Sequence, residues 1–156
     1  MTKVGNQAPD FTLPDQDRRD VVLTEKLTEH GVVVLAFFPA AFSSVCTKEL
    51  CTFRDQLGSL DRLKNTCVLG ISVDTPFSLK AFSTQEALNF SLLSDFNKTV
   101  IRAYGVVNPD MIGLKDISKR AVFVVGSDGS IRHQEVLDDA RLEPNYEKLY
   151  EVVKAI

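Results

Sequence analysis

Short runs of apolar, β-favouring residues alternate along the chain with segments of helical period. Because alternating strands and helices pack as layers, this pattern predicts an α/β fold. The run 32–38 has no polar position, which is typical of a central strand covered on both faces. The predicted strands are residues 21–23, 32–38, 68–73, 121–125 and 131–136, and the predicted helices are residues 44–57, 78–87, 98–104 and 145–155.

The last two predicted strands are joined by a tight-turn sequence, Ser-Asp-Gly-Ser at 127–130. Asp and Gly tolerate the positive φ that hairpin turns require, so these strands should pair antiparallel within a mixed sheet. A parallel strand–helix–strand unit, a terminal hairpin and a final helix opened by Pro144 and Asn145 together predict a thioredoxin-like fold, with helices flanking the sheet and a β extension at the amino terminus. A chain of 156 residues is expected to form a single domain over residues 1–156.

Composition and charge restrict the partners that we expect. With 44% hydrophobic and 25% charged residues and a net charge of -3, the chain has an average soluble composition and gives no sign of a nucleic-acid partner. The longest apolar run, residues 32–42, is shorter than the roughly 20 residues of a membrane helix. The amino terminus lacks the apolar region of a secretory signal. We therefore expect a cytoplasmic protein with no membrane partner.

Three cysteines, Cys46, Cys51 and Cys67, carry the candidate chemistry. An odd, small number of cysteines in a reducing compartment indicates redox groups, metal ligands or packing. A zinc site would need paired ligands at short spacing, and His30 and His133 show none. Neither histidine is near a cysteine in the sequence, so nothing indicates a cysteine–histidine hydrolase. Cys67 precedes a predicted buried strand, where packing is the expected role.

Cys46 follows the predicted central strand at the start of a helix. Pro39 ends the strand because it cannot donate to the ladder, and Ser43 or Ser44 can cap the helix that follows. In the first turn of a helix, unpaired N–H groups and the helix dipole favour an anion such as a thiolate. Ser43 lies three residues before the thiol, at the same helix end, and can donate a hydrogen bond to it.

The helical period places Cys46 on the inward face of its helix. Leu50, Phe53 and Leu57 follow it at positions that share an apolar stripe. Two interpretations of an inward thiol are open at this point. Cys46 is either a small hydrophobic residue of the core or a nucleophile at the base of a pocket.

Three segments resemble motifs of the peroxiredoxins. Pro39, Ser43 and Cys46 match the active-site pattern Pro-x-x-x-Thr/Ser-x-x-Cys, residues 5–11 resemble the amino-terminal Gly-x-x-Ala-Pro-Asp-Phe signature, and residues 119–125 resemble the arginine-bearing strand. Their order and spacing extend the resemblance over nearly the whole chain. The resemblance implies a thiol peroxidase that reduces hydrogen peroxide and organic hydroperoxides and that needs no metal, haem or flavin.

The resemblance also implies individual roles. Cys46 would be the peroxidatic thiolate that becomes a sulfenic acid, Ser43 would orient and polarise the peroxide, and Pro39 would shield the thiolate from water. Arg120 would supply fixed positive charge, although an arginine that heads an apolar strand otherwise marks a strand end in solvent. Glu49 either orients Arg120 or is a solvated carboxylate of the first helical turns.

The spacing of Cys46 and Cys51 resembles that of the peroxiredoxin Q, or bacterioferritin comigratory protein, subfamily, in which the second cysteine resolves the sulfenic acid as a disulfide. In an intact helix, Cα atoms five residues apart are separated by roughly 8.6 Å. A disulfide spans at most about 7 Å without backbone movement, so the helix would have to unwind. Cys51 is otherwise a helix-face cysteine without a redox role. Residues 92–96 and 103–106 resemble instead the one-cysteine alkyl hydroperoxide reductase E type, whose resolving thiol belongs to another molecule.

The resemblance implies thioredoxin as the reductant, with glutaredoxin or a small thiol as alternatives, and a monomer or homodimer as the oligomeric state. The loop 107–117 is expected to set the peroxide preference. A rival function is a thioredoxin-like disulfide reductase, but the chain lacks the Cys-x-x-Cys spacing of that chemistry. A second rival is a non-catalytic binding module whose cysteines only pack.

Overall fold

The computed structural model describes residues 2–59 and 65–156, with the side chains of residues 57–59 outside the described part. Five helices and nine strands are assigned within those ranges. The strands are β1 (Thr12–Pro14), β2 (Asp20–Val22), β3 (Val32–Phe37), β4 (Thr66–Ser72), β5 (Ser91–Ser94), β6 (Val107–Met111), β7 (Leu114–Ser118), β8 (Arg120–Val125) and β9 (Ile131–Leu137). The helices are α1 (Leu23–His30), α2 (Ser44–Ser59), α3 (Pro76–Gln85), α4 (Thr99–Ala103) and α5 (Tyr146–Ala155).

The predicted mixed α/β sheet is confirmed. Five strands form the central sheet in the order β5-β4-β3-β8-β9, so the apolar run predicted as the middle strand is β3. This strand pairs parallel with β4 and antiparallel with β8, and β9 pairs antiparallel with β8 through the predicted turn, where Gly129 has a φ of 81°. The central strand is apolar throughout because both of its faces are buried.

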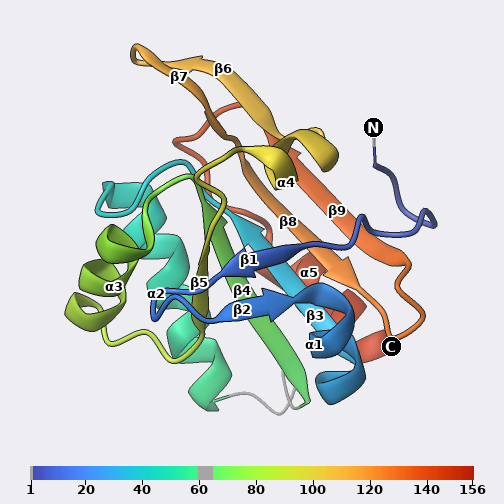
Figure 1. The fold of residues 1–156 in the computed structure, drawn as a ribbon. Coiled ribbons are helices and arrows are strands. Elements are labelled where there is room, and N and C mark those ends of the chain that lie inside the picture. Colours follow the sequence, from blue (N-terminus) through green and yellow to red (C-terminus); the bar gives the residue numbers. More distant parts are fainter. Residues whose placement is uncertain (1, 60–64) are drawn as a thin grey trace.

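Each face of the sheet is covered by its own apolar cluster. Odd-numbered residues of β3, such as Leu35, pack with α1, α4 and the amino-terminal segment. Even-numbered residues, such as Ala36, pack with α2, α3 and α5. Figure 1 shows α1 and the β1–β2 pair on one side of the sheet and α5 on the other. The expected flanking by helices and the amino-terminal β extension are both observed.

Four features of the fold were missed by the sequence pattern. The short strands β1 and β5, the helix α1 and the β6–β7 hairpin were not predicted. The segment 107–117, expected to be a loop, is largely this hairpin, which projects beyond one end of the strands of the central sheet (Figure 1). In the described ranges no helix is long and apolar enough to cross a bilayer.

The register of the central sheet brings the segments that carry the candidate chemistry to the same end of the strands. Phe37, the last residue of β3, pairs with Ala121 near the start of β8. Because these strands run antiparallel, the chain that leaves β3 toward Cys46 lies beside Arg120, which begins β8. Cys46 and Arg120, which are 74 residues apart in the sequence, are therefore neighbours, as the motifs imply.

Candidate active site

The loop between β3 and α2 has a shape held by hydrogen bonds. The Ala41 N–H donates to Asp74 Oδ2 at 2.8 Å, which ties the loop to the segment after β4. Phe42 adopts a left-handed φ of 69°, a conformation that costs about 1 kcal/mol or more outside glycine. The carbonyl oxygen of Ala40 accepts from both the N–H and the hydroxyl of Ser43, the latter at 2.8 Å. These bonds fix the turn that delivers the chain into α2.

Helix α2 begins directly after Ser43. The Ser43 carbonyl accepts from the Thr47 N–H at 2.9 Å, so Ser43 is the capping residue by its backbone. Its hydroxyl donates to Ala40 instead of accepting from the first turn. Cys46 is the third residue of the helix, as predicted, so its N–H belongs to the first turn and has no acceptor within the helix.

Cys46 is buried, with 1% of its surface exposed, and lies in the cluster that contains Leu50 and Phe53. The inward orientation predicted from the helical period is therefore observed, and the side chain of Leu57 lies outside the described residues. The Cys46 sulfur also accepts a hydrogen bond from Arg120 Nη2 at 3.3 Å. A cysteine that serves only as a small apolar residue does not require a buried, charged donor at its sulfur.

Arg120 is held at three points although only 1% of its surface is exposed. Besides the Cys46 sulfur, Nη2 donates to the Ala140 carbonyl oxygen at 2.9 Å, and Nη1 donates to Glu49 Oε2 at 3.2 Å. The alternative of a solvated strand end is wrong for this residue. A guanidinium that is fixed on several sides provides positive charge without needing to reorganise during a reaction.

Glu49 is fully buried, so its alternative as a solvated carboxylate is also wrong. One turn after Cys46, it forms an ion pair with Arg120 through Oε2, while Oε1 has no hydrogen-bond partner among the residues that the structure describes. Burial raises the pKa of Glu49 to about 7; the Arg120 charge opposes this rise, and the charges of Glu143 and Glu135 add to it. The carboxyl group therefore changes its charge close to neutral pH.

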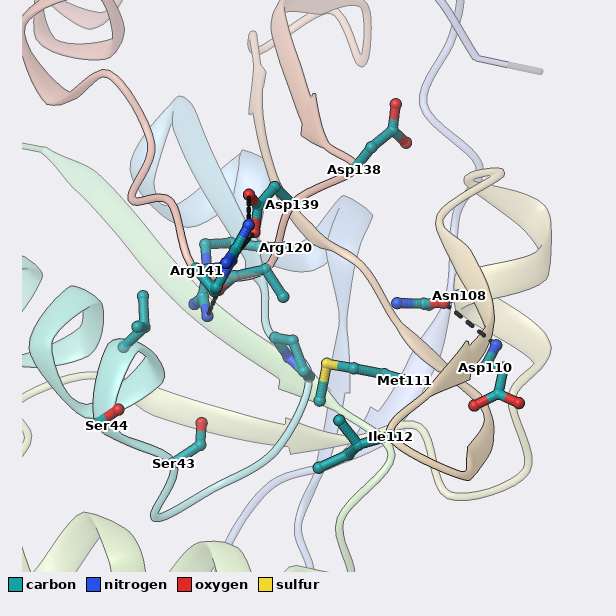
Figure 2. Close-up of a pocket in the computed structure, with 13 residues that line it drawn as sticks. Ser43, Ser44, Asn108, Asp110, Met111, Ile112, Arg120, Asp138, Asp139 and Arg141 are labelled. Carbon is teal, nitrogen blue, oxygen red and sulfur yellow. Dashed lines mark hydrogen bonds and ion pairs between the residues drawn. The ribbon is translucent and has the colours of Figure 1, made fainter.

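A pocket of about 680 Å³ opens beside Arg120. Figure 2 shows Ser43 and Ser44 on one side, and Met111 and Ile112 pointing toward them from the β6–β7 hairpin. Arg120 contributes to the wall, and the Cys46 sulfur lies behind it within hydrogen-bond distance. The lining residues are Pro39, Ser43, Ser44, Val45, Asn108, Asp110, Met111, Ile112, Arg120, Asp138, Asp139, Ala140 and Arg141.

Cys51 lies in the same helix as Cys46 but meets a different part of the molecule. Its Sγ is 3.4 Å from Glu86 Oε2, at the end of α3, and donates a hydrogen bond to it. Burial, and then the hydrogen bond to Glu86, raise the pKa of the Cys51 thiol. All three cysteines are free thiols, and α2 is continuous across both Cys46 and Cys51.

Cys67 lies in β4, away from the pocket. It packs against the apolar cluster on the α1 side of the sheet, which agrees with the packing role expected for it. Burial raises the pKa of the Cys67 thiol to about 11, so it is a neutral thiol at physiological pH. Cys46 and its neighbours are therefore the candidates for the chemistry of the site.

Comparisons with known proteins agree with this arrangement. Residues 4–134 match the AhpC/TSA family. The chain belongs to this family. It is 37% identical over 147 residues to peroxiredoxin Bcp of Escherichia coli K12, a match that covers 93% of this chain and 91% of the relative. It is 40% identical over 138 residues to alkyl hydroperoxide reductase E of Mycobacterium bovis, with 87% and 86% covered.

Solved structures of AhpC/TSA-type proteins share the fold. The crystal structure of peroxidoxin BcpB from Mycobacterium tuberculosis superposes with a TM-score of 0.87 at 30% identity, over 100% of this chain and 99% of that one. A bacterioferritin comigratory protein of Xanthomonas campestris shares the fold with a TM-score of 0.81 at 21% identity. The thioredoxin-like fold and the peroxiredoxin resemblance are thus confirmed, and the protein is a thiol peroxidase. Both subfamilies considered from the sequence are represented among its relatives.

Several residues of this AhpC/TSA site carried no recognisable signal in the sequence. The Ala140 contribution is a backbone carbonyl, which any residue type supplies. Met111 and Ile112 belong to the unpredicted hairpin. Asp74 lies two residues after β4 and Glu86 directly follows α3, and only their tertiary contacts distinguish them. By contrast, Pro39, Ser43, Cys46, Glu49 and Arg120 are brought together as the motif implied.

Proposed function

We propose that Cys46 is the peroxidatic thiolate of this thiol peroxidase. Its sulfur attacks one oxygen of a hydroperoxide, so that an S–O bond forms while the O–O bond breaks. Cys46 becomes a sulfenic acid, and the departing hydroxide or alkoxide takes up a proton and leaves as water or an alcohol. The hydrogen bond from Arg120 Nη2 to Cys46 Sγ carries this proposal. It places the fixed positive charge of a guanidinium that lines the pocket directly beside the sulfur.

The pocket residues have complementary roles in this proposal. Ser43 turns its hydroxyl from the Ala40 carbonyl oxygen toward a bound peroxide, whose oxygen it orients and polarises. Pro39 presents an apolar ring without an N–H donor and shields the thiolate from water. Glu49 does not reach the pocket wall; it orients Arg120 through their buried ion pair.

Cys51 then resolves the sulfenic acid as a disulfide with Cys46, and water leaves. Because both cysteines lie in continuous α2, this step requires the first turns of the helix to unwind. Both thiols are free and α2 is intact between them, which is consistent with the reduced enzyme. The alternative resolving thiol is one from another molecule, as in the one-cysteine type.

The substrates in this proposal are hydrogen peroxide and organic hydroperoxides. The relative named alkyl hydroperoxide reductase E supports the organic class, and the apolar side chains of Met111 and Ile112 in the pocket wall suit an alkyl group. Thioredoxin or a similar thiol reductant reopens the disulfide in the cytoplasm. The enzyme acts as a monomer or homodimer, which light scattering of reduced and oxidised protein distinguishes.

Peroxide consumption with dithiothreitol as reductant tests the role of Cys46. Cys46→Ser should lower consumption to the uncatalysed background, because serine is not ionised at neutral pH and cannot form a sulfenic acid. Cys67→Ser, which removes a packing thiol on the other face of the sheet, should keep the wild-type rate. Equal rates for wild type and Cys46→Ser would end the proposal.

Disulfide mapping tests the role of Cys51 separately. After one equivalent of peroxide, mass spectrometry should find a Cys46–Cys51 disulfide and an unmodified Cys67. A persistent Cys46 sulfenic acid beside a free Cys51 would exclude the intrahelical step and assign resolution to another molecule. That result would leave the first step untouched.

A further inference from the structure

The resting position of Cys51 is defined by a carboxylate on another helix. Glu86 is the residue that caps the end of α3, and its Oε2 accepts a hydrogen bond from Cys51 Sγ at 3.4 Å. Its Oε1 accepts from Gln85 Nε2 at 3.4 Å. The thiol of Cys51 is therefore bonded toward α3, whereas the Cys46 sulfur is bonded toward Arg120 of β8. The two sulfurs belong to different hydrogen-bond networks.

A second set of bonds fastens the same part of α2. Arg54 Nη1 donates to the Glu86 carbonyl oxygen at 2.6 Å, and Asn89 Nδ2 donates to the Arg54 carbonyl oxygen at 3.1 Å. These two bonds use the backbone of Glu86 and Arg54, so they do not depend on the Glu86 carboxylate. Substituting the side chain of Glu86 therefore isolates its bond to Cys51 from the packing of the two helices.

The charges around Cys51 come from both helices. Glu86 faces it from α3, and Arg54 and Asp55 face it from α2. Burial raises the pKa of this thiol most, the hydrogen bond to Glu86 adds to the rise, and the Arg54 charge opposes it. At neutral pH the sulfur thus carries its proton and shares it with the carboxylate, which makes it a poor nucleophile.

We propose that Glu86 is a positioning residue that holds the Cys51 thiol toward α3 until α2 unwinds. This inference rests on the proposed role of Cys51 as the resolving thiol. When the helix opens, the bond to Glu86 breaks, and the freed thiol loses its proton and attacks the Cys46 sulfenic acid. An S–S bond forms, the S–O bond of the sulfenic acid breaks, and the departing hydroxide combines with the proton to give water.

The consequence is an ordered sequence of two steps. While Cys51 is bonded to Glu86, it does not compete with Cys46 for peroxide, because the thiolate is the reactive form. The bond also opposes unwinding, since it must break before the two sulfurs can meet. Glu86 therefore slows the second step and leaves the first step unchanged.

Thiol alkylation tests the sulfur directly and needs no peroxidase activity. In a Cys46→Ser, Cys67→Ser background, the pH profile of iodoacetamide alkylation reports Cys51 alone. Glu86→Gln should move the midpoint of this profile to lower pH, because the amide keeps the shape but removes the negative charge. Glu151→Gln, which makes the same change at an exposed position of α5, should leave the profile in place. An unmoved midpoint in Glu86→Gln overturns the inference.

Single-turnover kinetics test the effect on the reaction. Reduced protein is mixed with one equivalent of hydrogen peroxide, quenched at intervals and analysed by mass spectrometry. In Glu86→Gln, sulfenic acid should form at the wild-type rate and convert to disulfide about three- to tenfold faster, because the neutral amide holds the Cys51 thiol by a weaker hydrogen bond than the carboxylate does. Conversion that is unchanged or slower overturns the role of Glu86. A wild type that forms no Cys46–Cys51 disulfide overturns the resolving step instead, so the two failures are told apart.

Discussion

The Nη2 atom of Arg120 lies 3.3 Å from the sulfur of Cys46, although 74 residues separate them in the sequence. The same guanidinium is anchored by Glu49 and by the Ala140 carbonyl oxygen, so its position beside the sulfur is fixed by α2 and by the segment that follows β9. In the proposed reaction, a charge held in this way stabilises the Cys46 thiolate and the oxygen that leaves the peroxide. The consequences of this arrangement are measurable.

Arg120→Lys should lower the second-order rate constant for peroxide by about 10- to 100-fold, because one ammonium group cannot reach three acceptors that surround a planar guanidinium. Stopped-flow competition with a second peroxidase measures this constant. Arg141→Lys is the matched control, since Arg141 lines the same pocket but is mostly exposed. If both variants lose activity equally, the fixed position of Arg120 is not what matters.

Glu49 should make the stability of the protein depend on pH in an unusual direction. Its pKa is about 7 in the folded protein, above the ordinary value near 4.5, so the folded state binds the proton more tightly than the unfolded state. The favourable contribution is complete below pH 4.5 and is lost as pH rises to 7. Denaturant titrations should show the free energy of unfolding of wild type, relative to Glu49→Gln, falling by about 3 kcal/mol between pH 4 and pH 8.

Glu151→Gln serves as the control for Glu49→Gln, because the exposed Glu151 is on α5. Its unfolding free energy should run parallel to that of wild type over the whole range. Parallel curves for Glu49→Gln as well would mean that the pKa of Glu49 is the same in the folded and the unfolded protein. The buried ion pair with Arg120 would then offset the burial of the carboxylate.

Asp74 should control the order of the loop that leads to Cys46. Asp74→Ala removes the acceptor of the Ala41 N–H and of the Ser72 hydroxyl, and the left-handed Phe42 between Ala41 and Ser43 is then free to relax. We expect amide hydrogen exchange of residues 40–43 to accelerate and the peroxide rate constant to fall about tenfold.

Asp128→Ala is the control for Asp74→Ala. Asp128 accepts similar hydrogen bonds from Ser130, but in the β8–β9 turn. Its loss should leave both the exchange of residues 40–43 and the peroxide rate constant unchanged. A wild-type rate constant in Asp74→Ala would show that the bond to Ala41 is dispensable for the loop.

Ile112 should influence which peroxide reacts fastest. It is 89% exposed at the tip of the β6–β7 hairpin, and it lines the pocket beside Met111. Ile112→Ser removes apolar surface that an alkyl group can cover, so kcat/KM for cumene hydroperoxide should fall about three- to tenfold, while that for hydrogen peroxide stays constant. Ile156→Ser, an exposed apolar residue at the carboxyl terminus, should change neither value.

The sequence predicted the features that an apolar run or a motif encodes. The unbroken apolar run of β3 predicted the middle strand, and the motif predicted that Arg120 meets Cys46. The helix α1 was missed because it is a short helix whose capping residue, Val22, makes no side-chain cap. The apolar pattern places Leu23 at the end of a strand. In the structure the strand ends at Val22, and Leu23 is the first residue of α1.

The hairpin and the outer contacts could not be predicted for physical reasons. The β6–β7 turn depends on positive φ values at Ile112 and Gly113, and isoleucine gives no turn signal. The bond between Cys51 and Glu86 depends on how two helices pack, which no local pattern encodes. The sequence therefore predicted the candidate reacting groups, whereas the tertiary structure shows what surrounds them.

The projecting β6–β7 hairpin has a consequence for how this enzyme can change. It pairs only with itself in the described sheets, and it supplies one wall of the pocket while Cys46, Glu49 and Arg120 are held by the central sheet and α2. If the proposed site is correct, substitutions or insertions at its tip alter the peroxide preference without disturbing the Cys46 thiol. In an engineered or evolving lineage, the hairpin can therefore change while the residues around the Cys46 thiol stay the same.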